Sequence, residues 1–176
     1  TPEQFLREQL SRDNSALVVT GERVLDAELP GQLQARVLLE AVGLGERTFS
    51  TIQRRAGLDA MTMTRSLEAL ARQKRLVATR QPYSTEAAKE PRYLVADDYL
   101  RFWLHFINDA LPEISRGRGR VVAERILGSW QSYAGRAVEP LVRRSIEHML
   151  PDPRFGAAKY AGGWWNRTNS IEVDLV

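Results

Sequence analysis

Hydroxyl and guanidinium side chains gather in a stretch with helical periodicity, residues 60–73. Its first turns carry Thr62, Thr64, Arg65 and Ser66, and Arg72 follows further along. An arginine suits bidentate contact with guanine, which is worth roughly 1–3 kcal/mol of discrimination per good pair. Arg54, Arg55 and Arg80 lie outside this stretch and are suited to hold phosphates, which supplies salt-sensitive affinity without sequence specificity. These residue types favour contact with DNA.

Two carboxylates stand at alternate positions in the last segment, SIEVDLV. This segment alternates as a strand does, so Glu172 and Asp174 point to the same face of it. Such a pair either lines a site or faces solvent on an edge strand. The residues alone leave both interpretations open.

The elements that must position the basic residues follow from the pattern of residues 31–97. Three helices are predicted, over 32–42, 48–56 and 60–73. The inward face of the first holds Leu33, Val37, Leu38, Ala41 and Val42. Gly57 allows a tight turn before the third helix, and alternating strands follow over 76–80 and 91–97. This order is typical of a winged helix-turn-helix, whose third helix enters the major groove; a three-helix bundle with a loose loop is the alternative.

The flanking segments predict further elements. Residues 1–30 predict a short helix, from about Pro2 to Ser11, and then an extended piece around LVVTGERVL. The segment DDYLRFWLHFIND has almost no polar face, so a core or a partner must cover it. Phe102, Trp103 and Phe106 make this helix a candidate surface for a homo-oligomer.

The remaining residues predict a basic linker over 113–125, a helical region and a final strand. The inward stripe of the helical region is Val122, Ile126, Trp130, Tyr133, Ala137, Leu141 and Ile146. A kink or a break into two helices is expected from Gly128, Gly135 and Pro140.

Composition limits the classes of function. The net charge of +3 conceals two basic blocks: residues 31–97 hold eleven basic and seven acidic groups, and residues 116–144 hold seven arginines and two glutamates. Such blocks suit an anionic partner, although solvated helix faces are the alternative. The chain has no cysteine and only two histidines, which makes a zinc site unexpected. No apolar run is long enough to span a bilayer, so we expect a cytoplasmic protein without a membrane partner.

The order of these elements resembles the C-terminal region of archaeal-type P-loop ATPases, which also occur in bacteria. The resemblance depends on the segments RYLVADDYLRFWLHFI, WQSYAGRAVEPLVRR and GGWWNRTNSIEVDLV, and nearly all of residues 17–176 follows the family pattern. It implies an ATP-binding domain upstream of Thr1, then a winged helix, then a domain similar to PD-(D/E)XK nucleases. The chain itself has no G-x-x-x-x-G-K-[ST] motif, so ATP hydrolysis is not expected of it.

The resemblance also implies catalytic positions. Glu139 matches the carboxylate of the first nuclease helix and Asp174 matches the strand aspartate, with Glu172 on the same face as Asp174. Magnesium is usually held by one or two carboxylates together with substrate phosphate, and it activates water there. The chain departs from the pattern after Asp174, because no (D/E)-x-K strand follows and Lys159 precedes the strand. We therefore expect no nuclease activity from these residues alone and no cofactor in this chain. The resemblance implies magnesium in the full-length nuclease-like domain and ATP in the upstream domain.

The sequence thus predicts an α+β fold that is mainly α: a winged helix-turn-helix and a helical region leading into a partial restriction-endonuclease-like α/β domain. The expected parts are 1–30, a linker from the upstream ATPase domain; 31–97, the winged helix; 98–118, the aromatic bridging helix and linker; and 119–176, the truncated N-terminal part of the nuclease-like domain. The leading hypothesis is a DNA-associating, non-catalytic portion of a P-loop ATPase. The alternatives are an intramolecular or subunit interaction module, and part of a nuclease active only in the full-length protein.

Overall fold

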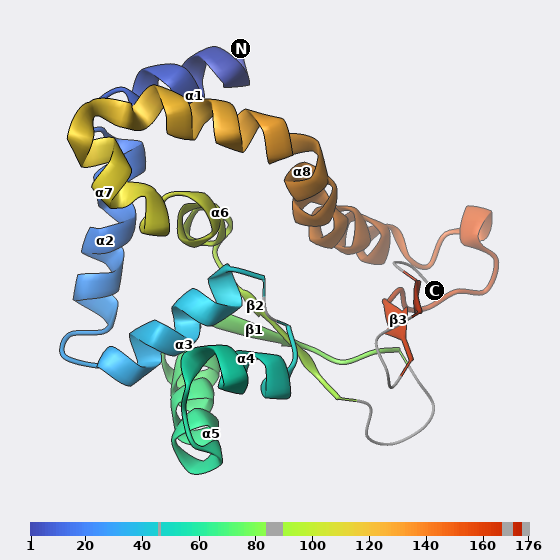
Figure 1. Ribbon diagram of the computed structural model, residues 1–176. Helices are drawn as coiled ribbons and strands as arrows, with labels where there is room; N and C mark the ends of the chain where they lie inside the picture. The colour runs from blue at the N-terminus through green and yellow to red at the C-terminus, as the bar shows by residue number, and fades with distance from the viewer. Residues whose placement is uncertain (46, 84–89, 167–170, 174–176) are drawn as a thin grey trace. The chain divides into compact units, whose positions relative to one another are not determined.

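The structure of the chain, a computed structural model, describes residues 1–45, 47–83, 90–166 and 171–173. The chain divides into two compact units. Unit 1 is Thr1–Thr79 with Arg92–Ser129, and unit 2 is Arg80–Pro91 with Trp130–Val176. Most of the described residues are helical, and two small two-stranded sheets accompany the helices (Figure 1). The fold is therefore α+β and mainly α, as the sequence predicts.

Unit 1 begins with two helices, α1 (Pro2–Leu10) and α2 (Ala16–Glu28). The prediction of an extended piece over LVVTGERVL is wrong, because these residues form most of α2. Val18, Gly21 and Leu25 are buried along one side of it. Gly21 faces the indole of Trp103, where an added Cβ would overlap the ring. Packing against that ring outweighs the local strand preference of the β-branched residues in this segment.

Three predicted helices are confirmed, as α3 (Leu33–Gly43), α4 (Phe49–Ala56) and α5 (Ala60–Glu68), the last extended by the π-helical turn η1 (Ala69–Gln73). Thr48 begins α4 with a capping box in which its hydroxyl and that of Thr51 each accept from the other's backbone N–H. Gly57 ends α4 at φ +65°, a left-handed conformation that glycine adopts readily. These end signals are local, which explains why the sequence predicts them.

The predicted inward face of α3 needs correction. Leu38, Ala41 and Val42 are buried, whereas Leu33 is 74% exposed and Val37 is at the surface. Leu39 is fully buried instead, because α3 contacts α4, α5, α6 and β2 and its buried side is wide. The spacing of apolar residues predicted the position of α3 correctly, but it predicted only some of the residues that are buried.

The two predicted strands are β1 (Val77–Arg80) and β2 (Arg92–Val95), which pair in one sheet. Val77 and Val95 are buried against the helices of unit 1. The backbone N–H of Tyr93 donates to the carbonyl of Arg47 at 2.8 Å, which ties β2 to the segment between α3 and α4. The sheet is thereby fixed against the three-helix group.

Helix α6 (Asp98–Phe106) lies in the middle of unit 1. Trp103 is completely buried, and its indole N–H donates to the carbonyl of Val18 at 2.7 Å. The chain's own α2 and α3 cover this side of the helix. Trp103 is therefore a core residue and is not accessible to a second copy; only Phe102 and Phe106 of the predicted surface remain partly exposed.

The short helical turns η2 (Asn108–Ala110), α7 (Leu111–Glu113) and η3 (Ile114–Arg118) lead into the long helix α8 (Gly119–Met149). The prediction of an exposed linker over 113–125 is wrong in part, since Ile114, Gly119 and Val122 are buried. Gly119 lies so close to the carbonyl of Leu10 that an added Cβ would overlap it. Helix α8 is continuous through Gly128, Gly135 and Pro140, so the predicted break into two helices is wrong, whereas the predicted kink stays a prediction.

Unit 2 contains the second part of α8, the turn η4 (Pro153–Phe155) and the strands β3 (Trp164–Trp165) and β4 (Glu172–Val173). The strands are antiparallel, with Trp164 opposite Val173 and Trp165 opposite Glu172. Trp165 is buried, and its indole N–H donates to the carbonyl of Glu90 at 3.3 Å. Leu141, predicted to face inward, is 46% exposed.

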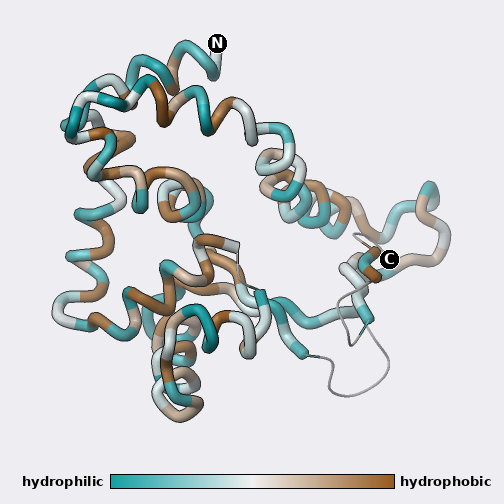
Figure 2. Tube along the Cα trace, in the orientation of Figure 1, coloured by the Kyte–Doolittle hydropathy of each residue, from teal (hydrophilic) through white to brown (hydrophobic). Residues whose placement is uncertain are grey.

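Hydrophilic residues recur along every long helix (Figure 2). Accordingly, within the described ranges we find no helix whose length and apolar character would let it cross a membrane.

Candidate functional site

The solvent face of α5 carries several of the residues predicted to contact DNA. Its opposite side is buried through Met63 and Leu67. Thr64 and Arg65 are exposed, as is Arg72 one turn beyond the helix, so these three share the solvent side. Thr62 and Ser66 are only half exposed and flank this face. Of the residues predicted on this helix, three therefore face solvent and two are partly covered, and their contact with DNA stays a prediction.

The last turn of α4 supplies two further guanidinium groups. Arg54 and Arg55 are exposed and directly precede the turn at Gly57. Within the part of the chain that the structure describes, neither they nor Arg65 makes an ion pair with an acidic side chain. Their charge is thus not neutralised by a neighbouring carboxylate.

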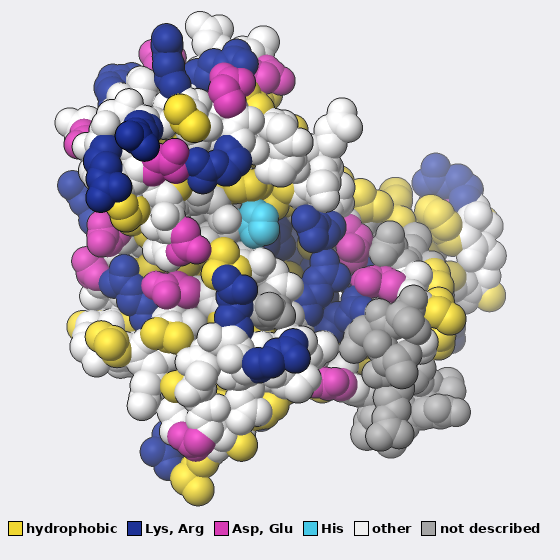
Figure 3. Space-filling view, in the orientation of Figure 1, with side chains coloured by type: hydrophobic (Ala, Val, Ile, Leu, Met, Phe, Trp, Pro, Cys, Tyr) yellow, Lys and Arg dark blue, Asp and Glu magenta, His cyan; other side chains and the backbone are white. Residues whose placement is uncertain are grey.

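Arg72 and Ser66 were also predicted to contact DNA, and both have neighbours in the structure. Arg72 lies 3.3 Å from Glu68 in an exposed ion pair, which is weak in water. Ser66 lines a small hollow of about 360 Å³ together with the start of α3, residues 31–35. On the face shown in Figure 3, basic and acidic side chains are interspersed over the surface, so no continuous field of one sign covers it.

An acidic residue caps the beginning of α5. The carboxylate of Asp59 accepts from the backbone N–H groups of Met61 at 3.0 Å and Thr62 at 2.9 Å. Hydrogen bonds from Thr62 and Met61 lower the pKa of Asp59 below its usual value of 3.8. The ionised cap therefore stabilises the fold above the pKa of the unfolded chain, and that contribution is lost as the pH falls through the lower folded-state pKa.

We expect Asp59→Asn to remove this pH dependence while keeping an N-cap acceptor. The difference in unfolding free energy between the wild type and the variant should be constant from about pH 5 to 8, where Asp59 is ionised in both states. It should decline only below pH 4, which urea unfolding over a pH series measures. A difference that already changes near neutral pH would contradict the assignment.

In unit 2, Glu139 is held between two arginines. Its Oε1 lies 2.7 Å from Nη2 of Arg143, one helical turn later in α8, and 3.6 Å from Nη1 of Arg80. The Glu139 side chain is 21% exposed and the Arg143 side chain 14%, so solvent screens this pair only in part. Arg80, predicted to contact DNA phosphate, is thus engaged by Glu139 in the structure.

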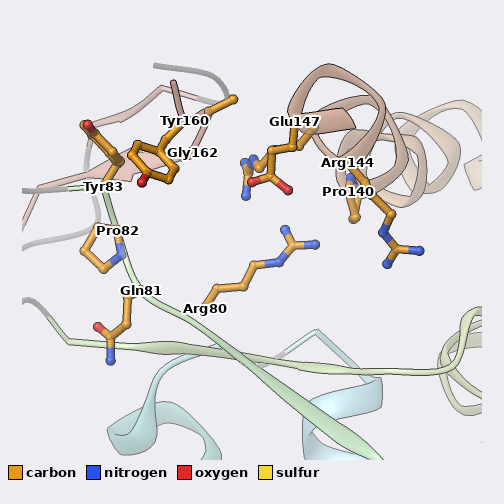
Figure 4. Close-up of a pocket in the computed structure, with 12 residues that line it drawn as sticks. Arg80, Gln81, Pro82, Tyr83, Pro140, Arg144, Glu147, Tyr160 and Gly162 are labelled. Atoms are coloured by element: carbon orange, nitrogen blue, oxygen red, sulfur yellow. The ribbon is translucent and has the colours of Figure 1, made fainter. Parts of the chain in front are cut away.

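An open pocket of about 580 Å³ lies beside this cluster. Its charged lining residues are Arg80, Arg143, Arg144 and Glu147. Tyr83 and Tyr160 line it as well, together with the glycine pair Gly162 and Gly163. In Figure 4 the two tyrosines lie near each other on one side, and Arg80 extends into the space below Glu147. The pocket therefore combines guanidinium groups with aromatic rings.

The residues predicted to hold magnesium are not assembled in the described part of the chain. Glu139 binds two guanidinium groups, Glu172 is exposed on β4, and Asp174 lies outside the described residues. Among the residues that are described, no group of three histidine or acidic side chains could hold a metal ion. Because Asp174 lies outside the described residues, the magnesium site of Glu139, Glu172 and Asp174 stays a prediction.

Most of the pocket residues were not predicted from the sequence. Arg143 had a signal, since it follows Glu139 at the i, i+4 spacing that pairs side chains on a helix. No sequence pattern points to Tyr83 and Gly163, because they are 80 positions apart. In the structure the backbone N–H of Tyr83 donates to the carbonyl of Gly163 at 2.7 Å. Only the folded chain brings these segments together.

Comparison with known proteins finds similarity to proteins of unknown function. Residues 103–176 match the DUF234 family model, which is described as archaeal and bacterial proteins of unknown function. The chain is also similar to uncharacterized protein MJECL04 of Methanocaldococcus jannaschii, with 25% identity over 179 residues. That alignment covers 98% of this chain and 38% of the relative, so the chain spans well under half of the relative's length. No solved structure matches the chain.

Proposed function

We propose that this chain is a DNA-associating, non-catalytic C-terminal portion of a P-loop ATPase. In this proposal α3, α4, α5 and the β1–β2 sheet form a winged helix, and α5 enters the major groove. The order of these elements supports it, as does the tight turn at Gly57 between α4 and α5. A relative of which the chain covers 38% leaves room for an upstream nucleotide-binding domain.

One observation carries the proposal. The outward face of α5 presents Thr64 and Arg65, and the last turn of α4 presents Arg54 and Arg55, without acidic partners among the described residues. A hydroxyl and a guanidinium on a groove-entering helix supply base-edge and phosphate contacts, and the neighbouring arginines supply phosphate contacts. Asp59 at the start of α5 repels phosphate, which would direct the backbone of the DNA towards the arginines.

We expect Arg65→Ala to weaken binding to a fluorescent duplex by about tenfold, because a lost guanidinium contact costs roughly 1–3 kcal/mol. Fluorescence anisotropy over a salt series measures both the affinity and the slope of its logarithm against the logarithm of salt concentration. Arg54→Ala removes a phosphate contact and should lower that slope by about one.

Arg23→Ala is the matched control for both variants. It removes the same charge from an exposed position of α2, outside the proposed winged helix. Equal losses for Arg23→Ala and Arg65→Ala, or an affinity that is independent of salt, would contradict the proposal.

A further inference from the structure

We propose that the pocket of unit 2 binds a nucleoside phosphate, with the phosphate at the arginines and the base against the tyrosines. This site is separate from the proposed DNA contact of α5 and does not depend on it. A nucleoside phosphate is available either as a free nucleotide or as the phosphorylated end of a nucleic acid strand, and the pocket would recognise the same chemistry in both.

The arginines favour an anionic group. Three of the lining residues, Arg80, Arg143 and Arg144, are arginines, and only Glu147 is acidic. Glu139 holds the guanidinium groups of Arg80 and Arg143 beside each other, so their positions are fixed before a ligand arrives. Planar guanidinium groups match the oxygens of phosphate in bidentate geometry.

Arg144 adds a charge that is still available to a ligand. It is exposed, lines the pocket from α8, and forms no ion pair within the described residues. An exposed guanidinium beside two ordered ones favours a group with several anionic oxygens over a single carboxylate.

The opposite side of the pocket favours a planar ring. Tyr83 is 51% exposed and Tyr160 is 73% exposed, although both line the pocket. Aromatic side chains that remain accessible in this way stack on nucleobases. Glu147 can accept hydrogen bonds from the amino or hydroxyl groups of a nucleoside. The volume of about 580 Å³ lies within the usual range for small-molecule sites.

Gly162 and Gly163 leave room in the pocket lining for the side chains of Arg143 and Tyr83, because glycine has no Cβ. A Cβ at Gly163 would lie 2.7 Å from Nη2 of Arg143, and one at Gly162 would lie 3.0 Å from Cβ of Tyr83. Alanine at position 163 would therefore displace the end of the Arg143 side chain from its place beside Glu139. The glycines thus set the position of a guanidinium and of a ring at the same site.

Isothermal titration calorimetry on the 176-residue chain tests the proposal, with adenosine 5′-monophosphate as the probe. Saturable binding is expected, and it should be weakened about tenfold by Arg144→Gln, since a hydrogen bond to a charged group is worth roughly 1.5–3 kcal/mol. Gly163→Ala should weaken it as well. Arg120→Gln is the matched control, because it removes an exposed arginine of the same helix outside the pocket.

A series of ligands distinguishes the phosphate part of the site from the base part. It also distinguishes a free nucleotide from the phosphorylated end of a strand. Adenosine and inorganic phosphate should each bind more weakly than the nucleotide. A short single-stranded oligonucleotide with a 5′-phosphate should compete with the nucleotide if strand ends fit, and the same oligonucleotide without phosphate should not. Absence of saturable binding, or equal losses for Arg144→Gln and Arg120→Gln, would overturn the proposal. Arg65→Ala should leave nucleotide binding unchanged, so failure here is distinguishable from failure of the duplex contact.

Discussion

Replacing Trp103 by alanine is expected to lower the free energy of unfolding by about 3–5 kcal/mol, the usual cost of deleting a large buried aromatic side chain. Trp103 is fully buried, faces Gly21 of α2 and donates its indole N–H to Val18. The substitution leaves a cavity between α2 and α6 and also removes the indole hydrogen bond to the Val18 carbonyl. Chemical denaturation followed by circular dichroism measures the loss.

Phe102→Ala is the control, since it truncates the neighbouring aromatic residue at a partly exposed position. Its effect on stability should be clearly smaller. The two variants also distinguish a core role of Trp103 from a role in a subunit interface. If Trp103 formed a subunit contact, its replacement would dissociate a dimer without unfolding the chain. A Trp103→Ala protein of unchanged stability would show that α6 does not pack on α2 as described.

Gly119→Ala and Gly128→Ala are expected to change stability in opposite directions, although both lie in α8. At Gly119 a Cβ would overlap the carbonyl of Leu10, so α1 and α8 must separate, and overpacking of this kind costs typically 1–3 kcal/mol. At Gly128 a Cβ meets nothing within 4 Å, so alanine gains up to about 1 kcal/mol of helix propensity.

Thermal unfolding of the two variants beside the wild type measures this difference. Limited proteolysis adds a local measure, because cleavage within α1 should become faster in Gly119→Ala alone. Stabilisation by both substitutions would show that α1 is not held against the start of α8.

The elements around the proposed winged helix were predictable because their signals are local. Thr48 and Asp59 cap α4 and α5, Gly57 ends α4, and each of these residues acts within one turn of its own position. The buried stripe of Met63 and Leu67 has a plain helical period. Sequence patterns of this kind describe a helix whatever it packs against.

The parts that failed depend on distant residues. Helix α2 was predicted as extended because Val18 and its neighbours favour strands, and only Trp103, 85 positions later, explains why they are helical. The burial of Gly119 likewise depends on Leu10. Conversely, the exposure of Leu33 could not be foreseen from its spacing alone.

The candidate sites likewise contain residues with local sequence signals and residues that only distant segments bring together. Thr64 and Arg65 could be assigned to a solvent-facing helix from their spacing relative to the buried stripe. Arg80 was assigned to phosphate contact, and its proximity to Glu139 arises from two segments 59 positions apart. No local pattern joins these segments, so the pocket and its charges appear only in the folded chain.

The most direct test of the central claim is to record the amide NMR spectrum of the isotopically labelled chain while short duplex DNA is added. The proposed contact predicts that shift changes concentrate at Thr64, Arg65 and the last turn of α4, and that they diminish as salt is raised. Changes confined to other helices, with the α5 amides unmoved at saturating DNA, would contradict the account.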